Sequence, residues 1–473
     1  MSLSAQLQNK QIVILGVGIT GLACVRFLHQ QGLSFTVNDS RANAIDSAKF
    51  QQDYPNVQLI LGDWNVEVLK QAHVIIASPG IDLNSTAIAP HISENCQVWG
   101  DVELFFQVIN DLQISVPTLA VTGSNGKSTV VSLLAHIAEK SDLNIALAGN
   151  IGKPIMDLLA DVNAIAALDC LILELSSFQL ETLHSMKACG ATILNVSDDH
   201  LDRHKTLANY QKIKQSIYQQ ACTIVVNRDD KLTQPLSNVN EQVLDTKQQT
   251  VSFGSNKPLA GQFGLVEINR QLHLSQGEKS LIKVTDLPLA GIHNALNCLA
   301  ALALGQSAGW QLNAMVNALA SFTGLAHRCQ HVATNDGVLW INDSKATNVG
   351  ATLAAIEGLA KTKTKQQQFI LIAGGEGKGA DFSPLQPAIA QSVDLLITLG
   401  KDGDKIALLS NKNKQVNSLE QAVDLASEQV KQGDIVLLSP ACASLDMFKN
   451  FAQRGDVFMQ AVQQLPQRRL AHE

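Results

Sequence analysis

The segment 122–129, Thr-Gly-Ser-Asn-Gly-Lys-Ser-Thr, constrains the fold of this chain more than any other. It lies between an apolar run at 118–121 and a helical pattern at 130–138. A strand, a glycine-rich turn and a helix form a phosphate cradle, because glycines let backbone N–H groups approach phosphates and the helix N-terminus adds a positive dipole end. Lys127 would then reach the terminal phosphates, and Ser128 would hold Mg²⁺.

The loop departs from the standard phosphate-binding pattern, which has a further glycine where this chain has Val121. A surface turn that contains Gly-Lys-Ser by chance is the simpler alternative, but the flanking strand and helix favour a cradle. We therefore expect ATP to be bound, with the loop residues Gly123, Ser124, Asn125, Gly126, Lys127, Ser128 and Thr129 around its phosphates.

A second glycine-rich turn lies near the N-terminus. An apolar run at 11–15 is followed by Gly16, Gly18 and Gly21, and the next apolar run ends at Asp39. A strand, Gly-x-Gly-x-x-Gly, a helix and an acidic residue after the second strand have the spacing of a dinucleotide-binding fingerprint. By spacing alone, this unit predicts NAD.

The length of 473 residues suggests about three domains. Short apolar runs, which are typical of buried parallel strands, recur along the chain. They predict an α/β fold of three domains, each a mainly parallel sheet with flanking helices: a Rossmann-like unit at 1–108, a P-loop ATPase-like unit at 109–325 and a second Rossmann-like unit at 326–473. Within the central unit, residues 248–286 have the pattern of short β segments.

The composition argues against several classes of protein. A net charge of −7 with scattered basic residues gives no footprint for nucleic acid. No apolar run approaches the ~18 residues that span a bilayer, and the polar N-terminus does not have the pattern of a signal peptide. Eight cysteines without zinc-like or redox-motif spacing indicate free thiols in a reducing compartment. We therefore expect a cytoplasmic protein without a membrane or nucleic-acid partner.

Polar residues follow several predicted strands. Glu174 ends one of them and suits the Mg²⁺ of a bound nucleotide, although a helix N-cap is the alternative. The acids and imidazoles at 198–204 could bind a second metal or begin a helix. Asn150 could position a substrate amide or phosphate. Asn294 and Asn297 are three residues apart and suit an adenine edge, with helix capping by Asn294 equally compatible.

The third unit offers two lysines beside tight turns, Lys345 and Lys378, which suit phosphates or carboxylates that arrive from another domain. Ordinary surface turns are the alternative. A nucleophile role for the segment 439–444 is rejected, because the chain has no Gly-x-Ser-x-Gly elbow there and no indicated base.

Together these motifs resemble the Mur ligases of bacterial cell-wall synthesis, in the right order over nearly the whole chain. The resemblance rests on segments 122–129, 173–180, 199–200, 291–294, 342–348 and 439–444. It implies that ATP phosphorylates the alanine carboxylate of UDP-N-acetylmuramoyl-L-alanine, and that D-glutamate attacks the acyl phosphate through a tetrahedral intermediate. The first domain would then hold UDP instead of NAD, and the protein would act as a monomer on small molecules.

The resemblance also implies roles for individual residues. Lys127, Glu174, His200, Lys214, Lys345 and Lys378 would be catalytic. Two Mg²⁺ ions would be held by Ser128 and Glu174, and by His200 and a carbamoylated Lys214, with Lys212 the less favoured alternative. The nucleotide would contact Asn294, Asn297, Arg328, Asp343 and Lys345, and D-glutamate would contact Thr347, Lys378, Ser444, Leu445 and Phe451. The UDP substrate would contact Ile19, Thr20, Asp39, Ser40, Arg41 and Gly80, with Asn150, Gln179 and His200 at its muramoyl-alanine end.

Three competing hypotheses remain from the sequence. A folylpolyglutamate synthase would share the ligase chemistry with a different substrate. An NAD-dependent dehydrogenase would explain the first domain only, and an ATP-driven switch would turn over ATP slowly without an amino acid. One departure from the family pattern is Glu376, where Asp is usual after Gly-Gly.

Overall fold

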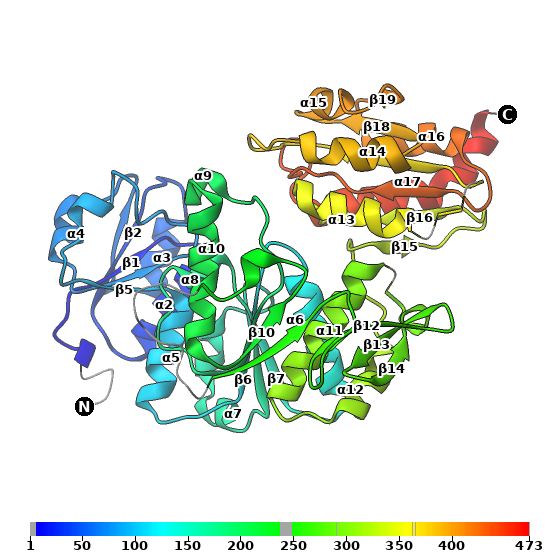
Figure 1. Cartoon of the computed structure of the whole chain (residues 1–473). Coiled ribbons are helices and arrows are strands. Elements are labelled where there is room, and N and C mark those ends of the chain that lie inside the picture. The colour runs from blue at the N-terminus through cyan, green and yellow to red at the C-terminus, as the bar shows by residue number, and fades with distance from the viewer. Residues whose placement is uncertain (1–5, 237–247, 290, 362, 365, 473) are drawn as a thin grey trace.

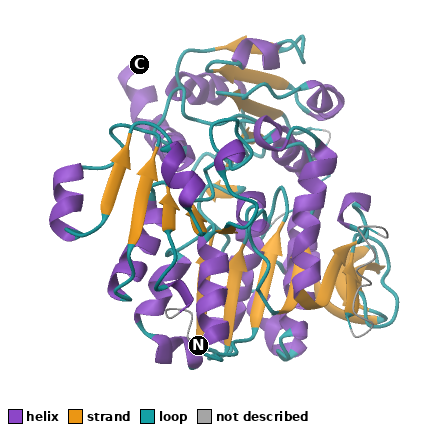
Figure 2. Cartoon of the chain, turned by 90° about the vertical axis from the view of Figure 1, so that its left-hand side faces the viewer, coloured by secondary structure: helices purple, strands orange, loops and turns teal. Residues whose placement is uncertain are grey.

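Three mainly parallel sheets follow one another along the chain in the computed structural model, which describes residues 6–236, 248–289, 291–361, 363–364 and 366–472 (Figure 1). Helices flank the strands in each domain (Figure 2). This arrangement confirms the α/β class predicted from the sequence. Among the helices of the described residues, none is both long and apolar enough to cross a membrane.

The N-terminal sheet has the order β3-β2-β1-β4-β5, and all its strands are parallel. The strand order reverses at β1, and ligands of open α/β sheets bind outside the carboxyl ends of the strands at such a point. The glycine-rich turn lies there, directly before α2 (Ile19–Gln30). The strands are β1 (Ile12–Leu15), β2 (Phe35–Asp39), β3 (Gln58–Leu61), β4 (Val74–Ala77) and β5 (Gln97–Trp99).

The central sheet is also parallel, with the order β11-β10-β9-β6-β8-β7. The phosphate loop joins its β6 to α6 (Lys127–Lys140), and the long helix α11 (Ile292–Ser307) packs beside α6. The strands are β6 (Thr118–Thr122), β7 (Ile145–Gly149), β8 (Cys170–Glu174), β9 (Ala188–Ile193), β10 (Ala221–Asn227) and β11 (Gln249–Phe253). A small antiparallel sheet of β12 (Phe263–Ile268), β13 (Gln271–Gln276) and β14 (Lys279–Lys283) follows, as the pattern at 248–286 predicts.

The C-terminal sheet has the order β15-β16-β20-β17-β18-β19, in which only the β15–β16 pair is antiparallel among the described strands. Helix α13 (Val349–Ala360) follows β16, and the chain ends in α17 (Phe451–His472). The strands are β15 (Gln330–Val332), β16 (Leu339–Asn342), β17 (Phe369–Gly374), β18 (Leu395–Leu399), β19 (Asn413–Gln415) and β20 (Ile435–Leu438).

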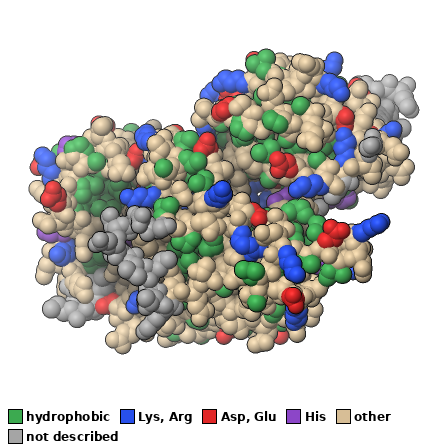
Figure 3. Space-filling model, in the orientation of Figure 1, with side chains coloured by type: hydrophobic (Ala, Val, Ile, Leu, Met, Phe, Trp, Pro, Cys, Tyr) green, Lys and Arg blue, Asp and Glu red, His purple; other side chains and the backbone are tan. Residues whose placement is uncertain are grey.

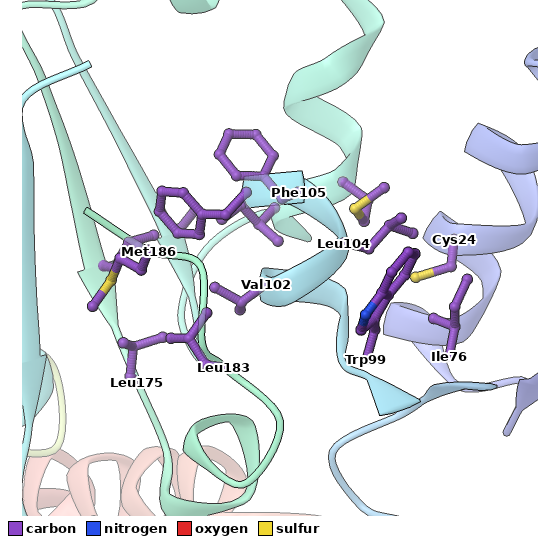
Figure 4. Close-up of a cluster of buried hydrophobic side chains, with 14 of the residues drawn as sticks. Cys24, Ile76, Trp99, Val102, Leu104, Phe105, Leu175, Leu183 and Met186 are labelled. Atoms are coloured by element: carbon purple, nitrogen blue, oxygen red, sulfur yellow. The ribbon is translucent and has the colours of Figure 1, made fainter. Parts of the chain in front are cut away.

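The N-terminal and central domains share one hydrophobic core, whereas the C-terminal domain has clusters of its own. Helix α5 (Asp101–Asp111) fills the junction: Val102 and Phe105 lie towards Leu183 and Met186 of the central domain, whereas Trp99, just before the helix, lies beside Cys24 and Ile76 of the N-terminal domain (Figure 4). The boundary that we expected at residue 108 falls inside this helix. Continuous apolar packing makes these two domains one unit, so any rigid-body movement of a domain is easiest for the third.

Candidate active site

The phosphate loop adopts the conformation that its glycines allow. Gly126 has a φ of 85° directly before α6, and an added Cβ there would lie 2.7 Å from the Oδ1 of Asn297. The ammonium of Lys127 donates to the carbonyls of Gly123 and Ser124 over 2.7 and 2.8 Å. Burial lowers the pKa of Lys127, although Glu174 opposes the shift. The loop is therefore closed around its own lysine.

The end of β9 holds the loop in place. Asn195 accepts from the backbone N–H of Asn125 over 2.8 Å and donates to its carbonyl over 3.1 Å. The hydroxyl of Ser124 donates to the carbonyl of Ser197 and accepts from its N–H. These side-chain hydrogen bonds hold the loop in one conformation, although the loop has no secondary structure of its own.

Glu174 has the features of a cation ligand. Its Oε1 accepts from the Nδ2 of Asn150 over 2.9 Å, whereas its buried Oε2 has no hydrogen-bond partner. The alternative of a helix N-cap is wrong, because Ser176 caps the short helix α8 (Ser177–Leu180) in a capping box with Gln179. A buried carboxylate oxygen without a partner is costly unless a cation or a ligand donor reaches it.

Lys214 is almost fully buried on α10 (Leu207–Gln215), and its neighbour Lys212 is exposed. The ammonium of Lys214 donates to the Oγ1 of Thr122 and the carbonyl of Gly123 over 3.2 and 3.1 Å. It also lies 4.5 Å from the ring centre of Tyr210. Burial, reinforced by the charge of Lys127, lowers the pKa of Lys214 well below its usual value. Burial and the nearby ammonium of Lys127 thus favour a neutral amine at Lys214.

His200 precedes the short helix α9 (Leu201–His204) in a left-handed conformation, with a φ of 54°. Its ring packs edge-to-face against Phe178, with the ring centres 4.8 Å apart. Its Nε2 lies 3.8 Å from a carboxylate oxygen of Asp199. Burial lowers the pKa of His200, although Asp199 opposes the shift.

The cluster of acids and imidazoles expected at 198–204 does not form a metal site from these side chains alone. No group of three or more His, Cys, Asp or Glu residues in the described part of the chain could hold a metal ion. The reason is local: α9 turns His204 inward, where its ring is almost fully buried, while His200 stays partly exposed. A metal at His200 would need a ligand of another chemical type.

A cavity of about 620 Å³ lies between the central and C-terminal domains, and Figure 3 shows a hollow between the two lobes. Gly291 precedes α11, so the alternative of helix capping by Asn294 is wrong. Asn297 donates to the Oδ1 of Asn294 over 3.3 Å, and both line the cavity. The buried Nδ1 of His293, which also lines it, has no hydrogen-bond partner. The cavity thus offers amide and imidazole groups to a base.

Arg328 reaches the phosphate loop from the third domain. Its guanidinium donates to the Oγ of Ser128 over 2.7 Å, which is the hydroxyl expected to hold Mg²⁺. Asp343 accepts from the backbone N–H of Cys329 over 3.2 Å and from the hydroxyl of Ser439 over 2.9 Å. The ammonium of Lys345 lies 3.9 Å from the ring centre of Phe451, and burial together with Arg328 lowers the pKa of Lys345 to about 8.

The remaining residues of the expected glutamate pocket lie on the third domain. Ser444 is buried, Leu445 is 62% exposed and Lys378 is an exposed residue with a φ of 52°. Thr347 lies one residue before the N-cap of α13. Glu376 stands where Asp is usual in the family. Its longer side chain forms an ion pair with Lys401 over 2.9 Å, so it has a partner on the same domain.

The N-terminal residues surround the carboxyl end of β2. Asp39 accepts from the backbone N–H of Val17 over 2.9 Å and forms a two-pronged ion pair with Arg41. Burial raises the pKa of Asp39, but the bonds from Arg41 and Val17 outweigh it and bring the pKa to about 2. Ile19, the first residue of α2, is 77% exposed. Thr20, Ser40, Gly80 and Asn150 are partly or fully exposed, and Gln179 is buried.

Models of known protein families cover most of the chain. The Mur ligase middle domain matches residues 121–305, the MurD-like N-terminal domain of Mur ligases matches 10–100, and the glutamate ligase domain matches 327–442. A UDP-N-acetylmuramoylalanine–D-glutamate ligase from Colwellia psychrerythraea is 56% identical over 465 residues, which are 96% of this chain and 97% of that protein. The chain belongs to the Mur ligase family.

Two further relatives agree with this assignment. A ligase of the same name from Shewanella violacea is 45% identical and covers 97% of both chains. The crystal structure of MurF ligase from Thermotoga maritima in complex with ADP has the same fold, with a TM-score of 0.61 at 18% identity, and covers 92% of this chain and 96% of that one. The predicted family is therefore confirmed, and a dehydrogenase is not needed to explain the first domain of this Mur ligase.

The structure also reveals a polar chain beside the site that sequence reasoning missed. Ser177 bonds to the Nε2 of His204 over 2.9 Å, and the Nδ1 of His204 lies 3.5 Å from Glu181, which pairs with Arg203. Phe178 stacks on His204 and lies under Arg203. Burial lowers the pKa of His204 to about 4, so its ring is neutral at pH 7. The spacing of His200 and His204 in the sequence was the signal that could have indicated this polar chain.

One expected consequence concerns the stability of this Mur ligase. Burial raises the pKa of Asp343 from 3.8 to about 7, because the bonds from Ser439 and Cys329 offset the burial only in part. The folded state then favours the protonated carboxyl, so this contribution to stability is full below about pH 4 and is lost as the pH rises through 7. The unfolding free energy of Asp343→Asn relative to the wild type should therefore rise by about 4 kcal/mol between pH 4 and pH 8. Urea denaturation at both pH values measures this, and equal differences would contradict it.

Proposed function

We propose that this Mur ligase joins D-glutamate to UDP-N-acetylmuramoyl-L-alanine, with cleavage of ATP to ADP and phosphate, in the synthesis of peptidoglycan precursors. The observation that carries the proposal is the 56% identity to a ligase of that name over 96% of the chain. The geometry supports it, because Lys345 on the third domain lines the same cavity as Asn125 and Gly126 of the phosphate loop and interacts electrostatically with Lys127.

The residues beside the phosphate loop suit Mg²⁺. Glu174 offers a buried, unpartnered carboxylate oxygen, and Ser128 offers a hydroxyl that would have to exchange its bond from Arg328. Such an ion would neutralise phosphate charge during transfer. The second site would use His200 and a modified Lys214, whose neutral amine would add to carbon dioxide and release a proton to give a carbamate. The modification replaces an ammonium with oxygen ligands that Mg²⁺ prefers.

Residues of the site can then be assigned to each step of the proposed ligase reaction. A carboxylate does not react with an amine at neutral pH, so the terminal phosphate must first move to the alanine carboxylate. Lys127 neutralises the charge of that phosphate, and the loop N–H groups hold it in line. The amine of D-glutamate, held by Thr347, Ser444 and Lys378, attacks the acyl phosphate, and Lys345 stabilises the leaving phosphate.

The UDP end of the substrate would lie at the carboxyl ends of β1 and β2. The Asp39–Arg41 pair presents a fixed polar edge to the uracil, and the exposed Ile19 offers an apolar surface to its ring. Asn150 and Gln179 would then face the muramoyl-alanine end, close to the bond of Asn150 with Glu174.

The test is phosphate release with ATP, Mg²⁺ and UDP-N-acetylmuramoyl-L-alanine across a panel of amino acids. We expect D-glutamate to stimulate release over L-glutamate by about 100-fold or more, because a polar pocket rejects a misplaced amine strongly. Equal stimulation by L-glutamate, or none by D-glutamate, would overturn the proposal. Slow turnover that ignores the amino acid would favour an ATP-driven switch, and activity on a folate substrate would favour a folylpolyglutamate synthase.

A further inference from the structure

The central and C-terminal domains meet at the phosphate loop through two asparagine side chains. Asn125 lies inside the loop, and Asn348 lies at the start of α13. The Nδ2 of Asn348 donates to the Oδ1 of Asn125 over 3.2 Å, and the Nδ2 of Asn125 donates back to Asn348 over 3.5 Å. We call this reciprocal pair the amide clasp.

Asn348 has two further contacts that fix its orientation. Its Oδ1 caps α13 by accepting from the N–H of Ala351 over 2.9 Å. Its Nδ2 also lies 3.5 Å from a carboxylate oxygen of Asp199, which precedes His200. The clasp therefore connects the phosphate loop, the His200 segment and the first turn of α13. Thr347, which we place in the glutamate pocket, is the next residue towards β16.

The loop side of the clasp is rigid. The backbone of Asn125 is held at both its N–H and its carbonyl by Asn195, over 2.8 and 3.1 Å. A shift of α13 cannot be absorbed by the loop without breaking these bonds. The clasp therefore transmits the position of the loop to the third domain.

Gly350 brings the two domains unusually close at the same place. A Cβ at this position would lie 3.0 Å from the Oγ of Ser197 and 3.5 Å from the Nδ2 of Asn125. A larger side chain would crowd the hydroxyl of Ser197 and the amide of Asn125. The C-terminal domain has its own hydrophobic clusters, so polar contacts such as the clasp and the Arg328–Ser128 bond contribute to how this domain sits.

We propose that the amide clasp seats the C-terminal domain on the phosphate loop, and that Asn348 is thereby a positioning residue for the attack of D-glutamate. The proposal rests on the proposed function for its substrate. Asn348 does not touch the reacting atoms; it sets the distance between the phosphate held by Lys127 and the amino acid held beside Thr347. Misplacement of about an ångström is enough to slow such a reaction severely.

Asn348→Ser is the decisive variant, because serine retains the N-cap of α13 but is too short to form the clasp. We expect kcat/KM for D-glutamate to fall about tenfold, as for the loss of two neutral hydrogen bonds. Asn348→Asp also retains the cap, but its carboxylate would face that of Asp199, so kcat/KM for D-glutamate should fall further than in Asn348→Ser. Asp199→Asn should then recover part of that loss.

A double-mutant cycle separates positioning from a general structural role. Once Asn125→Ser has broken the clasp, adding Asn348→Ser should cause less than about a twofold further loss. Multiplied effects of the two changes would overturn the proposal, as would unchanged kcat/KM for D-glutamate in Asn348→Ser. The control is Ser418→Ala, which removes the N-cap of α16 (Leu419–Gln429) in the same domain and should lower thermal stability without changing kcat/KM.

Small-angle scattering provides a readout that does not depend on the reaction. Asn348→Ser and Gly350→Val should both increase the radius of gyration relative to the wild type, whereas Ser418→Ala should not. Unchanged radii of gyration in Asn348→Ser and Gly350→Val would overturn the proposal that the clasp seats the domain, even if the wild type is fully active. If instead the wild type shows no phosphate release with D-glutamate, the proposed function fails while the scattering result still decides the clasp.

Discussion

Lys214→Ala is expected to reduce ligase activity about 100-fold or more, whereas Lys212→Ala should change it less than about twofold. The two lysines are two positions apart on α10, but only Lys214 is buried against the phosphate loop. In the proposed mechanism Lys214 supplies a metal ligand after carbamoylation, and alanine removes it. Phosphate release at saturating substrates measures both variants, and the reverse order of effects would show that the wrong lysine has been assigned.

Stability has to be separated from this effect, because Lys214 is a large buried side chain. Lys214→Met keeps most of the volume and removes the amine. Since burial lowers the pKa of Lys214, removing its proton on folding costs free energy at pH 7, and the methionine variant should unfold at the same temperature or higher. An inactive but stable Lys214→Met variant places the loss in the chemistry.

The carbamate itself can be observed. Isotope-labelled bicarbonate should give a carbamate carbon signal in the wild type and in Lys212→Ala, but not in Lys214→Ala. A signal that persists in Lys214→Ala would assign the modification to another lysine.

Local sequence patterns predicted the elements that carry the site. The glycines at 123 and 126 need their positive φ values, and a loop between a buried strand and a helix has few other conformations. Glu174 is the last residue of β8 and Asn195 lies two residues beyond β9, so the topology of the central sheet places both at one edge, and Asp343 lies one residue beyond β16 of the C-terminal sheet. The periodicity of strands and helices therefore indicated the fold class and the strand ends that carry the site residues.

Contacts between distant segments could not be predicted in the same way. The bond from Arg328 to Ser128 joins residues 200 positions apart, and the clasp between Asn125 and Asn348 joins residues 223 apart. Both depend on how the third domain sits, which no local pattern encodes. The shared core around α5 was missed for a similar reason, since amphipathic helices look alike whether they face one sheet or two.

The site combines several cations with few paired acids. Burial lowers the pKa of Lys127, Lys214 and Lys345, so each ammonium is less stable here than in water. A site with this arrangement is poised to bind anions, because phosphate groups restore the charge balance that the protein alone does not provide. The same arrangement costs folding free energy, so the removal of one of these amines should not destabilise the protein.

Lys127→Met is expected to lower kcat about 1,000-fold while leaving the protein at least as stable as the wild type. Methionine fills similar space but cannot neutralise the terminal phosphate during transfer. It also loses the bonds to the carbonyls of Gly123 and Ser124, but it removes a charge that the folded state disfavours.

The pH dependence of stability tests the stability part of this prediction. A lysine whose pKa is lower in the folded state than in the unfolded state releases its proton more easily when folded, so the wild type gains stability as the pH rises above that lowered pKa towards 10.5. Lys127→Met has no such group, so its advantage in unfolding free energy should shrink in alkaline solution. Lys140→Met, at the exposed end of the same helix, is the matched control and should alter neither kcat nor this pH dependence. Activity within tenfold of the wild type would refute the role of Lys127, because no other group in the loop carries a positive charge that could replace it.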